Sequence, residues 1–270
     1  MRILAVPVAA CLLGACTSTF AEPRLLVSPY LAVYRLHGDV AMQSAPAPGT
    51  LQDNQAQPTR TFGLDRHRDD LGVRADLGDG FAGLRLDYYR LDQGTTKSGL
   101  LEADWGRLLT GDEVRMTAAM DELRLGWLEP VFTARTTYRE RPLTVRVAAG
   151  GVLAHRDLTL RGRTTDGARM QHASIDGDVA YAAVRVRAAW RDFGVEGDYA
   201  FSPGLVLGGD YEDFQQDLEL RATYTLPLHD VTFFAGYRYS QLQAQGRADG
   251  FGYDADLVID GYQFGVSLVF

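Results

Sequence analysis

Apolar and polar residues alternate with a period of two along several segments of the chain. In residues 217–226 every even position is apolar, whereas every odd position is acidic, basic or a threonine. In residues 179–191 the even positions from Ala180 to Trp190 are apolar, and the odd positions include Arg185, Arg187 and Arg191. Successive side chains of a strand point to opposite faces, so these segments predict strands with one oily face and one charged face.

The last nine residues follow the same rule. Their large apolar side chains would share one face, namely Tyr262, Phe264, Val266, Leu268 and Phe270. Gln263, Gly265 and Ser267 would lie on the opposite face. A strand of this kind suits lipid on one side and a polar interior on the other. A soluble β-sandwich could also end on an alternating strand, but the repetition of the pattern along the chain favours a membrane barrel.

The pattern predicts ten strands, over residues 25–37, 62–77, 81–92, 114–128, 143–153, 179–191, 193–209, 217–226, 231–244 and 262–270. When they are folded into consecutive hairpins, turn-forming residues fall at the tips, with tight turns at one end and longer loops at the other. We therefore predict an all-β fold, a closed antiparallel up-and-down transmembrane β-barrel of about ten strands.

Three places leave eight or twelve strands possible. The first predicted strand is apolar on both faces, so its alternation does not set its register. Ser202-Pro203-Gly204 interrupts the predicted seventh strand, because proline cannot donate a hydrogen bond to a neighbouring strand. Residues 129–142 are too long for a tight turn, which indicates that the preceding strand continues past Trp127 with a bulge at Pro130.

Composition supports one exported domain. The 270 residues carry a formal net charge of −8, and Lys97 is the only lysine. Charges of both signs are spread over the predicted strands, so the chain has no basic stripe for nucleic acid. Arginine suits a polar barrel interior, since its planar fork stays charged and can hold two carboxylate oxygens at once.

The N-terminus is typical of an export signal. Arg2 precedes an apolar stretch over residues 3–15, and small residues follow. Cleavage after Ala21 would make residues 1–21 the signal peptide and residues 22–270 a single barrel domain. Cleavage after Ala15 would instead leave Cys16 as a lipidated N-terminus, and the sequence does not decide between the two.

The signal, the amphipathic strands and the C-terminal strand together resemble the small outer-membrane β-barrel proteins of Gram-negative bacteria. Residues 83–91 and 236–239 are also similar to strands of that superfamily. The resemblance implies an address in the outer membrane, contact with its lipid, and a C-terminal strand from Tyr262 to Phe270 that the barrel-assembly machinery reads. It leaves function open, because such barrels serve as pores, enzymes and adhesins.

Ten strands enclose a bore that side chains nearly fill. Charges shut away from water need partners, so we predict a ladder of arginine–carboxylate pairs across the lumen. Its members are Arg85, Asp87, Glu122, Arg124, Arg146, Arg185, Arg187, Glu196, Asp198, Glu219, Arg221 and Arg238, with Arg74 and Asp76 beside them. The alternative is a narrow channel for small solutes along these side chains.

The sequence offers few candidates for a catalytic site. His155 beside Asp157, or His67 near several aspartates, could imitate a protease site at the loop rim. A lipid hydrolase would need a histidine beside a serine, and residues 237–240 offer Ser240 without one. We find no spaced metal ligands and no cofactor motif, so we predict no enzyme, no metal and no cofactor.

Two long predicted loops, residues 39–60 and 94–116, are the candidate contacts for an extracellular ligand. Trp105, Leu108 and Leu109 are apolar residues in the second loop. They would either pack over the bore as a lid or contact a partner. The sequence thus predicts a barrel with a filled lumen and a structural or surface-interaction role. A narrow porin is the first alternative, and a rim-active protease or lipid hydrolase is the second.

Overall fold

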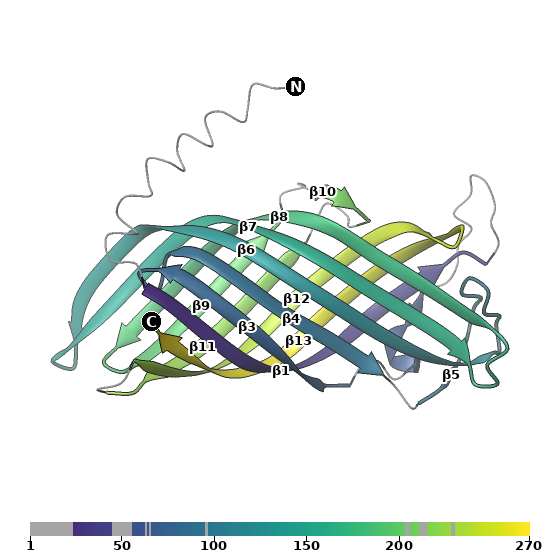
Figure 1. Cartoon of the computed structure of the whole chain (residues 1–270), viewed down its shortest axis with the longest axis horizontal. Coiled ribbons are helices and arrows are strands. Elements are labelled where there is room, and N and C mark those ends of the chain that lie inside the picture. The colour runs from purple at the N-terminus through teal and green to yellow at the C-terminus, as the bar shows by residue number, and fades with distance from the viewer. Residues whose placement is uncertain are drawn as a thin grey trace, which may run out of the picture.

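The structure, a computed structural model, describes residues 24–44, 56–62, 64, 66–94, 97–202, 206–210, 215–227 and 230–270. The predicted signal segment and Cys16 lie outside the described residues. The described chain forms one long cylinder of strands (Figure 1). Among these residues, no helix is long and apolar enough to cross a membrane.

Ten antiparallel strands close the cylinder, which confirms the predicted fold. In chain order they are β1 (Arg24–Met42), β3 (Arg68–Gly78), β4 (Gly83–Gly94), β6 (Glu113–Tyr138), β7 (Arg141–Thr164), β8 (Met170–Trp190), β9 (Phe193–Phe201), β11 (Gln216–Thr225), β12 (Val231–Ala248) and β13 (Phe251–Val269). Each pairs with the next, and β13 pairs with β1. Short elements accompany them: β2 (Gln57–Pro58), η1 (Thr59–Phe62), β5 (Gly99–Leu100) and β10 (Val206–Gly209).

The strands are strongly staggered around the ring. Leu25 pairs with Leu77, and successive partners lead through every strand back to β1 at His37. The stagger is therefore twelve residues (37 − 25) over ten strands. With a rise of about 3.3 Å per residue and a strand spacing of about 4.8 Å, this stagger tilts the strands by about 40° from the barrel axis.

The two ends of the cylinder differ in their connections. Tight turns join β3 to β4, β6 to β7 and β8 to β9 at the end that holds the C-terminus, which we call the turn end (Figure 1). The long connections between β1 and β3 and between β4 and β6 lie at the opposite end, the loop end. Both loops are shorter than the predicted 39–60 and 94–116, because residues 39–42 belong to β1 and residues 113–116 to β6.

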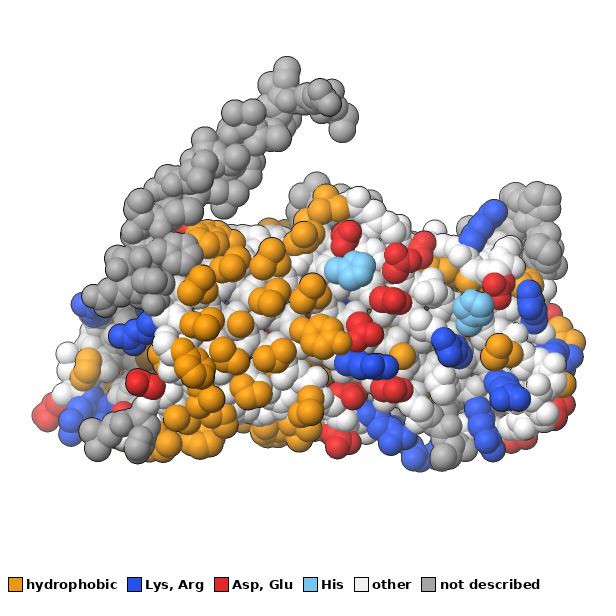
Figure 2. All heavy atoms as spheres, in the orientation of Figure 1, with side chains coloured by type: hydrophobic (Ala, Val, Ile, Leu, Met, Phe, Trp, Pro, Cys, Tyr) orange, Lys and Arg blue, Asp and Glu red, His pale blue; other side chains and the backbone are white. Residues whose placement is uncertain are grey.

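The outer surface changes from apolar to polar part of the way along each long strand. On β7, Leu153 is exposed in the half nearer the turn end. Moving toward the loop end, the next residues on the same face are His155, Asp157, Thr159 and Arg161. Figure 2 shows the result as a band of hydrophobic side chains over one half of the barrel and charged side chains over the other half.

The interior changes in the opposite sense. In the half inside the hydrophobic band, β6 directs the buried Glu122 and Arg124 inward. Toward the loop end the same face of β6 carries Met120, Met116 and Val114, which are also buried. One half of the barrel is therefore polar inside and oily outside, as in a membrane, and the other is oily inside and polar outside, as in water.

This reversal explains why several strands are longer than predicted. A strand needs about 9–11 residues to cross a membrane, but β6 has 26 and β7 has 24. β7 was expected over 143–153 and continues to Thr164. The continuation of β6 past Trp127 is confirmed, with a change of register between Pro130 and Phe132. Beyond that point β6 pairs only with β7, whereas β7 stays paired with β8 as far as Leu143. The end of β6 and the start of β7 form a projecting ribbon near the turn end (Figure 1).

Candidate functional site

The inward-facing charges form two networks at the level of the hydrophobic band. The network nearer the turn end, here the lower network, consists of Arg74, Arg85, Arg185, Arg187, Arg221, Asp76, Asp87, Glu196, Asp198 and Glu219. Its five arginines balance its five carboxylates. The upper network, nearer the loop end, consists of Arg124, Arg156, Arg238, Glu122 and Asp217. Its charges sum to +1.

Glu196 is the centre of the lower network. Its Oε2 lies 2.5 Å from Nη2 of Arg187, and its Oε1 pairs with Arg221. Arg85 and Arg185 approach the same carboxylate at 3.8 Å and bond more closely to Asp76 and Asp198. Because these side chains come from β3, β4, β8, β9 and β11, their contacts span the bore from wall to wall.

Glu122 holds the corresponding place in the upper network and is fully buried. Its carboxylate pairs with Arg156 and, at 2.5 Å, with Arg238, and Arg124 lies 3.5 Å away. Aromatic rings lie against the three arginines of this positively charged network. Arg124 and Arg156 lie 5.5 and 5.6 Å from the Tyr181 ring centre, and Arg238 lies 4.6 Å from that of Tyr89. Rings at these distances attract guanidinium groups, more strongly where water is excluded.

The structure places the predicted ladder residues on the inner face, and most lie in these two networks. Arg146 differs, because it lies near the turn end and pairs with Asp79 in the β3–β4 turn. Two members of the upper network, Arg156 and Asp217, are absent from the ladder predicted from the sequence. The alternation of side chains places both on the inner face, since Arg156 is in phase with Arg146 along β7 and Asp217 with Glu219 along β11.

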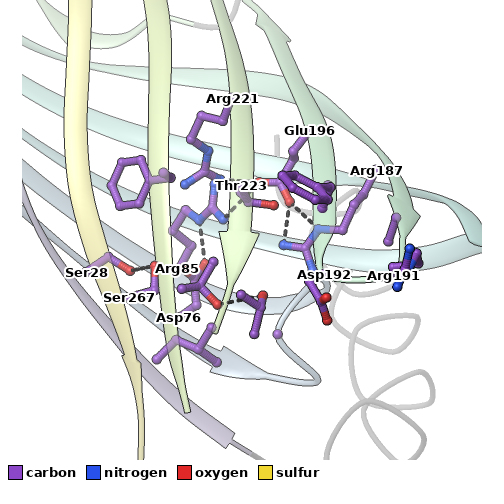
Figure 3. A pocket seen from close by; sticks show the side chains of 18 residues that line it. Ser28, Asp76, Arg85, Arg187, Arg191, Asp192, Glu196, Arg221, Thr223 and Ser267 are labelled. Atoms are coloured by element: carbon purple, nitrogen blue, oxygen red, sulfur yellow. Dashed lines mark hydrogen bonds and ion pairs between the residues drawn. The ribbon is translucent and has the colours of Figure 1, made fainter. Parts of the chain in front are cut away.

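A cavity of about 170 Å³ lies between the lower network and the turn end. Figure 3 shows Glu196 between Arg187 and Arg221 at this cavity, which Thr223 of β11 and Ser28 of β1 also line. The wall combines charged and polar side chains with the apolar Leu26, Phe193 and Phe234. Arg85, Arg187 and Arg221 in its lining already have carboxylate partners, so the cavity adjoins the ion-pair network.

The β3–β4 turn folds under the barrel and narrows it. Phe81 in this turn is buried, and the guanidinium groups of Arg146 and Arg187 lie 4.5 and 5.2 Å from its ring centre. Asp79 accepts hydrogen bonds from the backbone N–H groups of Phe81 and Ala82. Partial burial opposes ionisation of Asp79, but these bonds and Arg146 together lower the pKa of its carboxyl. A charged cap therefore fixes the turn.

Apolar side chains fill the barrel near the loop end. Trp105 and Leu108, which form a two-residue bridge in the β5–β6 connection, are almost fully buried. A Cβ at Gly162 on β7 would overlap Leu108 and come into tight contact with Trp105, which shows how closely both approach the inner wall. These residues were predicted either to pack over the bore as a lid or to contact a partner. Trp105 and Leu108 pack over the bore. Leu109 is partly exposed.

The histidines do not build a catalytic group among the described residues. His155 Nδ1 lies 3.0 Å from Asp178 Oδ1 instead of Asp157, on the outer surface. His37 pairs with Asp260 at 3.1 Å and His172 with Asp249 at 3.4 Å. No bond from a serine or cysteine to His155 is present in the described ranges. His67 is exposed, and His229 lies outside those ranges.

Metal binding has no support in the part of the chain that the structure describes. No three His, Cys, Asp or Glu side chains there are grouped so that they could hold a metal ion. The carboxylates inside the barrel are instead turned toward arginines.

Comparison with known proteins gives only distant similarities. No protein-family model matches the chain, and no curated protein matches it. Among solved structures, the chain is similar to Ail, the attachment invasion locus protein of Yersinia pestis, with 7% identity and a TM-score of 0.32 over 92% of this chain and 98% of that one. It is also similar to the toluene transporter TodX of Pseudomonas putida, with 10% identity and a TM-score of 0.29 over 95% and 92% of the two chains.

A third similar structure is the outer-membrane expressed OmpT of Vibrio cholerae, with 8% identity and a TM-score of 0.23 over 92% of this chain and 97% of that one. Similarities at this level do not bear on activity. The assignment of the barrel depends on its own closed ring, its hydrophobic band and its charged interior. By these features, the described residues form a transmembrane β-barrel of the outer-membrane type.

Proposed function

We propose that this protein is a closed outer-membrane barrel that holds a rigid binding surface outside the cell, and that it neither conducts solutes nor catalyses a reaction. In bacterial outer-membrane barrels, short turns face the periplasm and longer loops face the exterior. The loop end is therefore assigned to the cell surface, where the barrel continues beyond the lipid with a polar outer face.

The observation that supports this proposal best is that the interior is filled at successive levels. Phe81 lies at the turn end, and the two ion-pair networks follow. Trp105 and Leu108 then close the loop end. A solute that crossed would have to break buried ion pairs, and removing one partner of such a pair costs about 3–5 kcal/mol. A porin instead keeps an aqueous channel, which needs about sixteen strands.

Conductance in planar bilayers tests the proposal. The refolded barrel is expected to insert without producing discrete current steps, whereas a porin in the same bilayers produces them. Regular openings of the wild-type barrel that disappear when Arg185 or Arg187 is replaced by alanine would contradict the proposal. They would support the alternative of a narrow channel past the lower network.

A further inference from the structure

Three arginines cluster on the outer surface near the loop end. Arg115 on β6 and Arg161 and Arg163 on β7 are exposed, and we call them the basic face. Arg115 and Arg163 are paired directly across the two strands, and Arg161 faces Thr117. Like charges directly opposite each other on a sheet destabilise it. The free protein therefore tolerates a repulsion that a bound anion would relieve.

These three guanidinium groups have no carboxylate partner among the described residues. The neighbouring acids have other hydrogen-bond or ion-pair partners: Glu113 accepts hydrogen bonds from Ser98 and Thr165, Asp166 accepts one from the backbone N–H of Ala168, and Asp112 pairs with Arg169. The cluster is also unusual for a chain whose formal net charge is −8. Its charge is therefore available to a ligand in solution.

The basic face borders a shallow hollow of about 480 Å³, whose lining also includes Thr117, Thr164, Thr165 and one acidic residue, Asp166. Arg163 is ten residues beyond Leu153, the last outward-facing apolar residue of β7. At about 3.3 Å per residue and about 40° of tilt, this places it about 25 Å above the hydrophobic band. The exposed Asp121 and Asp157, which pair across β6 and β7, lie between the two levels. On the face shown in Figure 2, acidic side chains likewise adjoin the band, and basic side chains lie farther toward the loop end.

We propose that the basic face binds an acidic polysaccharide that approaches the cell surface from outside. Arginine forks match the geometry of carboxylate, sulfate and phosphate groups, and the exposed Thr117 hydroxyl can bond to a sugar hydroxyl. The lining contains no aromatic residue on which nucleic-acid bases would stack. Met170 is its one large apolar residue, whereas a protein partner would need an apolar centre. The height above the band argues against lipid headgroups.

This inference depends on the proposed interaction role, and the two can fail separately. Binding is measured on the full barrel in detergent micelles, with fluorescent dextran sulfate as the probe and neutral dextran as the comparison. The wild-type barrel is expected to bind dextran sulfate, with an affinity that falls as the salt concentration rises, and not to bind neutral dextran. Replacement of Arg115, Arg161 and Arg163 by alanine is expected to weaken binding at least tenfold.

The matched control replaces Arg135, Arg139 and Arg141 by alanine. These arginines are exposed on the projecting ribbon at the turn end, so the control removes the same charge from the other end. It is expected to change binding less than twofold. The first triple variant should keep or raise the thermal unfolding temperature, because it removes a repulsion, and this shows that it is folded.

Three outcomes overturn the inference: equal losses in both triple variants, binding of neutral dextran, or equally tight binding of a single-stranded DNA of the same charge. None of them would show that the lumen conducts. Current steps in the bilayer would reject the closed barrel without bearing on the basic face.

Discussion

Glu122 shows how much the barrel depends on single buried charges. It is the carboxylate that Arg156, Arg238 and Arg124 share. Its inward direction followed from strand alternation, because a one-residue shift would place it in lipid. Arg124 lies on the same face of the same strand, but the pairing with Arg156 and Arg238 could not be predicted, because it depends on a stagger between strands that no local pattern specifies. Arg156 was missed because the predicted strand ended before it.

Replacing Glu122 by glutamine should therefore destabilise the barrel strongly. The variant leaves three guanidinium groups around a neutral side chain, and loss of one partner from a buried ion pair costs about 3–5 kcal/mol. Urea unfolding in micelles measures the change. Glu140→Gln, at the exposed tip of the ribbon, should change the free energy of unfolding by less than about 0.5 kcal/mol. Equal effects of the two substitutions would show that the upper network contributes little.

At the level of elements, the sequence predicted the strands that cross the membrane better than their continuation above it. In residues 217–226 the oily and charged faces were assigned as the structure has them. In the upper part of β7 the outward residues become polar and the inward ones apolar, so a search for oily outer faces stopped at Leu153. The lid was predicted only as one alternative, since Trp105 needs the inner wall of β7 as a partner.

The close approach of the lid to β7 can be tested with one glycine. A Cβ at Gly162 would lie 2.9 Å from Leu108 Cδ1 and 3.3 Å from the Trp105 ring. Gly162→Val should displace this lid and speed tryptic cleavage after Arg107 at least fivefold. Gly94→Val is the matched control, because a Cβ there meets nothing within 4 Å, and it should leave the cleavage rate unchanged. A similar rate in both variants would contradict the described packing.

For the whole molecule, the account depends on a change of solvent along one cylinder. Apolar side chains cover the outside around Leu153, and ion pairs fill the inside there. Nearer the loop end, polar side chains cover the outside, and Leu158, Leu160 and Met116 are buried inside. The sequence could predict a barrel with a hydrophobic band, but not that the same strands would continue as a water-exposed barrel with an apolar core.

Spin labels on one face of one strand test this claim most directly. In a chain with Cys11 and Cys16 replaced by alanine, a label is attached at Leu153→Cys or at Thr159→Cys, and the barrel is placed in lipid bilayers. The label at 153 should collide mainly with oxygen, which dissolves in lipid, and the label at 159 mainly with a water-soluble nickel complex. Equal accessibility to the nickel complex at both sites, or to oxygen at both, would contradict the account.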